Sequence, residues 1–200
     1  MTARESFLQA ETFCALRLEQ VFNRCFSDSE RSLLIGGAAE PLYLPAGLED
    51  EDVPKLSAQW HRLYYREDYF ASALHEVSHW CIAGPARRLQ KDFGYWYAPD
   101  GRNAEQQQAF QVVEIKPQAL EWCFSQACAY PFRVSLDNLA GGPEARRDEL
   151  AFKQAVTARA RQLQDIGLPA RAQIFFRALA QEFGTRLELE DLEFSLAALS

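Results

Sequence analysis

Apolar side chains recur at helical intervals in several parts of the chain. In residues 11–26 they follow one another at mostly three- to four-residue steps, which predicts a helix. A second helix is expected over residues 69–82, with Gly84 as its C-cap and Pro85 as its stop. Residues 104–129 form a long helical region that Pro117 interrupts, either as the first turn of a new helix or as a kink.

Other segments have the composition of extended chain. Residues 61–66 are rich in aromatic side chains and predict a strand, while Gly36 and Gly37 are expected to break the chain. Three further stretches are expected to be extended: residues 41–45, between two prolines, and residues 93–97 and 130–134.

The C-terminal part predicts three more helices, near residues 145–165, 170–183 and 189–198. The whole pattern indicates a helix-rich α+β protein with a small sheet. We expect one domain over residues 1–200, with a core region at 11–140 and a C-terminal helical layer at 145–200.

Composition and charge narrow the class of protein. The hydrophobic share of 48% and charged share of 24% are typical of a globular chain. A net charge of −7 argues against nucleic acid as a partner. The sequence has no apolar run long enough to span a membrane, so we expect no membrane partner. The five cysteines form no C-x-x-C pair, and the N-terminus has no secretory pattern. We therefore expect a cytoplasmic enzyme with reduced thiols.

The most informative motif is the string His75-Glu76-Val77-Ser78-His79, an H-E-x-x-H sequence inside a predicted helix. His75 and His79 fall one turn apart on the same face, so both imidazoles can reach one metal ion. Glu76 lies beside them and could take a proton from a metal-bound water, which makes it the candidate catalytic residue.

A catalytic metal commonly has three protein ligands, so a third side chain is required elsewhere. Glu114 is the first candidate, because a carboxylate flanked by valine and isoleucine is costly to bury unless it is paired or binds a metal. Glu121 is the second, whereas His61 is interpreted as a polar residue that begins a strand. Two histidines and a carboxylate suit either Zn²⁺ in a peptidase or Fe(II) in an oxygenase, and the spacing does not separate these two.

The residues around the motif decide between these two cases. Four strings closely resemble the elongation factor P hydroxylase family of bacteria, and the resemblance is dense over about residues 11–140 and looser in the C-terminal helices. The strings are residues 69–84 (YFASALHEVSHWCIAG), 92–102 (DFGYWYAPDGR), 113–122 (VEIKPQALEW) and 130–139 (YPFRVSLDNL).

The resemblance implies a function. This family hydroxylates a lysine of translation elongation factor P that already carries a β-lysyl group, the last step of that post-translational modification. It further implies a zincin-like metal-binding core, a non-haem site that is expected to hold Fe(II), and O2 as co-substrate. His75, His79 and Glu114 would be the ligands, and Glu76 an acid/base or orienting residue. The resemblance identifies neither the electron donor nor the oligomeric state.

A lysylated lysine carries two ammonium groups, which carboxylates and aromatic faces can bind. Residues 92–102 offer both, and we expect substrate contacts there from Asp92, Tyr95, Trp96, Tyr97 and Asp100. The alternative is that these aromatic residues alternate into the core as a strand, with Asp100 serving a turn. The alternative for the whole protein is a zinc metallopeptidase of the gluzincin type, which the ligand set alone would favour.

Overall fold

The structure, a computed structural model, describes residues 13–51, 53, 58–92, 104–136 and 143–199. The chain forms two compact units, residues 1–94 and 95–200. The described residues contain five α-helices and one three-stranded sheet, so the expected helix-rich α+β class is confirmed. The single domain over residues 1–200 stays a prediction. None of the helices in the described residues is long and apolar enough to cross a bilayer.

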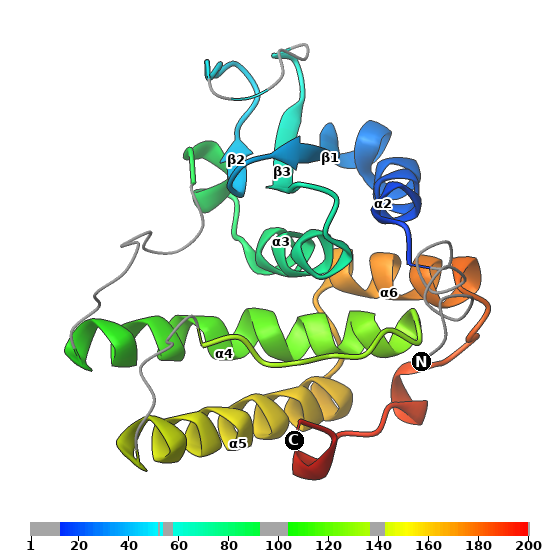
Figure 1. The fold of residues 1–200 in the computed structure, drawn as a ribbon. Helices are drawn as coiled ribbons and strands as arrows, with labels where there is room; N and C mark the ends of the chain where they lie inside the picture. Colours follow the sequence, from blue (N-terminus) through cyan, green and yellow to red (C-terminus); the bar gives the residue numbers. More distant parts are fainter. Residues whose placement is uncertain (1–12, 52, 54–57, 93–103, 137–142, 200) are drawn as a thin grey trace, which may run out of the picture. The chain divides into compact units, whose positions relative to one another are not determined.

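The first unit contains the sheet (Figure 1). Its strands β1 (Ser32–Ala38), β2 (Leu42–Leu44) and β3 (His61–Arg66) have the order β1-β3-β2. β3 pairs parallel with β1 and antiparallel with β2. The sequence predicts β2 and β3 correctly.

The expectation that Gly36 and Gly37 break the chain is wrong, because both lie inside β1. The β1–β3 register shifts between Ile35 and Ala38, so the two glycines form an irregularity within the strand. Gly37 has φ +85°, a conformation that L side chains rarely adopt. Glycine therefore marks a bend in the strand here rather than its end.

Two α-helices pack on this sheet. α2 (Ala15–Glu30) contacts β1, and α3 (Phe70–Ile82) contacts β3. The predicted helix at 11–26 thus starts and ends four residues later, whereas the motif helix agrees to one residue. Trp80 joins the two helices, since its ring lies 5.0 Å from that of Phe22 and 4.8 Å from that of Phe26.

α3 ends differently from the prediction. Its C-cap is Ala83, with an extended backbone at φ −64° and ψ 124°, and Gly84 does not adopt a left-handed conformation. Pro85 explains this end, because a proline disfavours helical backbone in the residue before it and cannot continue the helix. A short 3-10 turn, η1 (Arg87–Leu89), follows.

The described residues of the second unit form helices and irregular segments, with no strand of a sheet. It contains α4 (Ala104–Ala127), α5 (Pro143–Ile166) and α6 (Ala170–Glu182), and α4 packs against both of the others. Pro117 does not interrupt α4, which continues through it as one helix. The helix expected at 189–198 is instead two 3-10 turns, η2 (Leu189–Asp191) and η3 (Leu196–Leu199).

After α4 the chain turns back and runs along the same helix (Figure 1). The Tyr130 N–H donates to the Ser125 carbonyl, and the ring of Phe132 stacks on Trp122. Further on, the backbone of Ser135 bonds to the side chain of Gln118. We call residues 130–136 the return segment. It was expected to be extended, and it forms no helix or strand of a sheet.

Candidate metal centre

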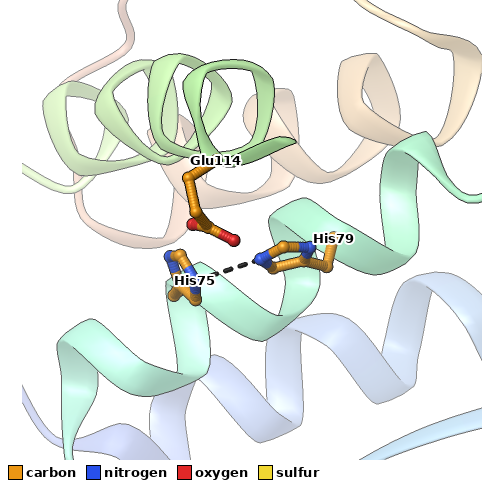
Figure 2. A group of neighbouring side chains, drawn as sticks. All are labelled: His75, His79 and Glu114. Atoms are coloured by element: carbon orange, nitrogen blue, oxygen red, sulfur yellow. Dashed lines mark hydrogen bonds between the residues drawn. The ribbon is translucent and has the colours of Figure 1, made fainter. Parts of the chain in front are cut away.

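The motif helix α3 brings the two histidines together. Nε2 of His75 and Nε2 of His79 lie 3.0 Å apart, and the two rings are nearly perpendicular at 71° (Figure 2). The prediction that these imidazoles share one face is therefore confirmed. Both side chains are partly exposed, as is Glu76 between them.

The spacing of the two nitrogens suits a shared ion. Two nitrogens that each lie about 2.1 Å from a metal are about 3 Å apart when the angle at the ion is near a right angle. The observed 3.0 Å between the Nε2 atoms matches this separation. The pair therefore fits two neighbouring positions of a metal coordination sphere.

The opposite side of α3 fixes the helix in place. Leu74, Val77 and Trp80 are buried there, and the Ser78 hydroxyl donates to the Leu74 carbonyl at 2.8 Å. The motif thus alternates between residues that bind the helix to the core and residues that remain accessible. This amphipathic arrangement holds the two imidazoles in a fixed orientation.

Glu114 lies on α4 in the second unit and is 2% exposed. Its Oε2 accepts a hydrogen bond from Nε2 of Gln118, 3.3 Å away. Glu121, the second candidate, is 8% exposed on the same helix. Burial raises the pKa of Tyr130 above its ordinary value, and the charge of Glu121 raises this pKa further. The burial that the choice of Glu114 assumed is therefore observed, and Glu121 is buried as well.

His61 is not a candidate ligand. It begins β3, as the sequence predicts, and its Nδ1 lies 2.9 Å from the Tyr43 hydroxyl and 3.2 Å from the Ala46 amide nitrogen. These contacts use the ring within the first unit, between β2 and β3. The structural interpretation of His61 is thus supported.

Of the five residues expected to bind substrate, the structure describes one. Asp92 forms a backbone bridge to Tyr43, and its carboxylate lies 2.5 Å from a guanidinium nitrogen of Arg87. Arg88 pairs with Glu30 at 2.7 Å. The sequence did not foresee these two ion pairs. The other four predicted contacts lie outside the described residues: Tyr95, Trp96, Tyr97 and Asp100.

Gln118 is a neighbour of the site that the sequence reasoning missed. Its side chain is buried, and it contacts both Glu114 and the return segment. The signal available was weak, because a glutamine one turn after a buried glutamate occurs on many helices. Only the position of Ser135 in the structure gives this amide its significance.

The paired imidazoles and the buried carboxylate are typical of proteins that bind a metal ion through histidine and an acidic residue. The sequence model that describes the elongation factor P hydroxylase family matches residues 21–194 of this chain. A curated relative from Haemophilus influenzae, the elongation factor P lysine hydroxylase, is 39% identical over 179 residues. These residues cover 90% of this chain and 94% of the relative. The chain belongs to the elongation factor P hydroxylase family.

Proposed function

We propose that this protein is an oxygenase that hydroxylates the β-lysylated lysine of elongation factor P, as the last step in the modification of that factor. The observation that carries the proposal is its membership of the hydroxylase family over nearly its full length. Neither comparison supports the zinc-peptidase alternative. Because its substrate is a translation factor, we place its action in the cytoplasm.

We propose further that His75, His79 and Glu114, the side chains drawn in Figure 2, hold one Fe(II) ion in a zincin-like core. Each offers one ligand atom, an imidazole nitrogen or a carboxylate oxygen. The 3.0 Å between the Nε2 atoms and the burial of Glu114 support this assignment. An Fe(II) ion bound by two histidines and one carboxylate keeps open positions and supplies the chemistry of O2 activation.

The chain's own residues have defined roles in this proposal. Neutral His75 and His79 each offer a lone pair at Nε2, so the pair must lose any proton bound there before it binds a cation. Glu114 supplies a buried negative charge, which is costly unless a cation or hydrogen-bond donors pair with it. Glu76 is partly exposed beside the histidines, where its carboxylate can hold a proton or orient a bound group.

The substrate arm carries positive charge, which directs our proposal for its binding site. Asp92, Tyr95, Trp96, Tyr97 and Asp100 offer carboxylates and aromatic faces to the two ammonium groups. Asp92 is already paired with Arg87, so in this proposal its carboxylate serves both the guanidinium and the substrate arm. Replacing Trp96 with alanine and Asp100 with asparagine should therefore raise KM for lysylated elongation factor P.

The decisive experiment measures the mass of elongation factor P. We expect the lysylated factor to gain the mass of one oxygen atom when it is incubated with this protein, Fe(II), O2 and a reductant. His75→Ala should abolish the gain, since one ligand is removed. An unchanged mass with the wild-type protein, or peptide cleavage by the zinc-loaded protein, would refute the proposal.

The identity of the third ligand needs a separate comparison. Glu114→Gln and Glu121→Gln each remove one buried charge from α4. We expect anaerobic titration with Fe(II) to show a large loss of affinity for the first variant and a small one for the second. The reverse order would assign the ligand to Glu121.

A further inference from the structure

One face of α4 carries a row of buried polar side chains. Its members are Gln107, Glu114, Gln118, Glu121 and Ser125. With 3.6 residues per turn, all five fall within an arc of roughly 60° around the helix axis. A row of this kind is costly inside a protein unless its members bond to partners. The partners of Gln118 are the most informative.

Gln118 is 1% exposed and makes three hydrogen bonds. Its Oε1 accepts the Ser135 N–H at 3.0 Å, and its Nε2 donates to the Ser135 carbonyl at 2.7 Å. The second proton of Nε2 points to Oε2 of Glu114, 3.3 Å away. The amide therefore uses both of its N–H donors.

The backbone of Ser135 fixes the orientation of this amide. If oxygen and nitrogen were exchanged, Oε1 would face the Ser135 carbonyl and the Glu114 carboxylate, and Nε2 would face an N–H group. Three contacts would then pair like with like, so the network excludes the exchange. In this arrangement Gln118 presents a donor, not an acceptor, to Glu114.

We propose that Gln118 is a positioning residue, which holds the Glu114 carboxylate in the orientation that binds the metal and fixes that orientation to the return segment. The inference rests on the proposed function, because it takes Glu114 as a ligand. Hydrogen-bond partners of metal ligands orient them, and their loss typically weakens metal binding about 10- to 100-fold. Gln118 has the donor, the burial and the fixed geometry for this role.

The chain offers a matched control in Gln107. It is also a buried glutamine on α4. Its Nε2 donates at 3.0 Å to the carbonyl of Leu136, which is the residue after Ser135. Gln107→Met and Gln118→Met thus each remove an amide that holds the return segment. The Gln118 amide in addition donates to the Glu114 carboxylate.

The test is anaerobic titration of each full-length variant with Fe(II), together with urea unfolding of the metal-free protein. We expect Gln118→Met to bind Fe(II) about tenfold more weakly than wild type. Gln107→Met should keep the wild-type affinity, although both variants lose stability. With Co(II) in place of Fe(II), the visible spectrum should change for Gln118→Met and superimpose on wild type for Gln107→Met.

Equal affinities and spectra for the two methionine variants would overturn the inference, because the role of Gln118 would then be structural. Should Gln118→Met not fold, the comparison is repeated with Gln118→Ala and Gln107→Ala. The smaller side chain leaves room for a water molecule at the Ser135 or Leu136 carbonyl that loses its amide partner. Glu114→Ala distinguishes the two proposals. If it binds Fe(II) as wild type does, the proposed metal site fails and the inference fails with it. If it loses binding while Gln118 variants do not, the inference alone fails.

Discussion

Gly36 lies where three elements of the first unit meet. Its N–H donates to Oε1 of Glu19 on α2 at 2.7 Å, and the Tyr65 hydroxyl on β3 donates to the same oxygen at 2.9 Å. A Cβ at position 36 would lie 2.6 Å from the Tyr65 hydroxyl oxygen. The position therefore needs glycine for space, and the pattern of the sequence alone could not show this.

Gly36→Ala should destabilise the protein, because the new methyl group must displace Tyr65 or β1. Overpacking of this kind typically costs about 1–3 kcal/mol, which urea unfolding followed by circular dichroism measures. Gly84→Ala is the control, since a Cβ there would meet nothing within 4 Å. It should change the free energy of unfolding by less than about 0.5 kcal/mol. Equal midpoints for the two variants would contradict the argument.

The Ala46 N–H donates to Nδ1 of His61, which favours the neutral tautomer with its proton on Nε2. Burial lowers the pKa of His61 below its ordinary value, and the charges of Arg88 and Arg31 lower this pKa further. Glu30 acts in the opposite direction with a smaller effect.

The lowered pKa of His61 predicts that stability depends on pH. Because the unfolded chain binds this proton more readily, the free energy of unfolding should be at its full value above about pH 6.5 and fall as the pH decreases below it. His61→Asn keeps an acceptor oxygen near the position of Nδ1 but does not titrate. Urea unfolding from pH 7.5 to about 5.5 should therefore give a smaller loss for the variant than for wild type. Parallel losses would exclude this role of His61.

At the scale of elements, local signals succeed and distant contacts limit them. The helix at 70–82 is predicted to one residue, because its apolar spacing lies within the segment and the proline that stops it, Pro85, follows closely. β1 was not predicted, because the reasons for its two glycines lie in another strand. Gly36 leaves space for Tyr65 of β3, and the pairing with β3 shifts register between Ile35 and Ala38. α4 continues through Pro117, since packing against α5 and α6 outweighs the propensity of one residue.

The position of α3 depends on Trp80, whose ring contacts Phe22 and Phe26 of α2. Trp80→Ala should cost about 3–5 kcal/mol, because it leaves a large cavity between the two helices. Residue 80 also follows His79 directly, so the same change should weaken Fe(II) binding. Leu89→Ala, at a side chain that is 72% exposed, should leave both properties near wild type. A small loss for Trp80→Ala in urea unfolding would mean that other contacts hold α3.

At the scale of the whole molecule, the candidate site was only partly readable from the sequence. His75 and His79 are four residues apart, so helix geometry alone places them together. Glu114 lies on another helix, in the other unit, and its selection rested on the cost of burying a charge. The role of Gln118 and the Arg87–Asp92 ion pair were not predicted, because a sequence does not show which groups an amide or a guanidinium contacts in the folded protein.

A metal ion that binds only the folded state must also stabilise the molecule as a whole. An ion that binds the folded state but not the unfolded state adds about 2.7 kcal/mol when its free concentration is 100 times Kd. We therefore expect Fe(II), added without oxygen, to raise the unfolding temperature, and a chelator to reverse the change. His75→Ala should unfold at the same temperature with and without the metal. His61→Asn alters the third histidine of the chain and should keep the full metal-dependent shift. A shift of equal size in His75→Ala would show that the ion binds elsewhere, and the assignment of the imidazole pair as ligands would be lost with it.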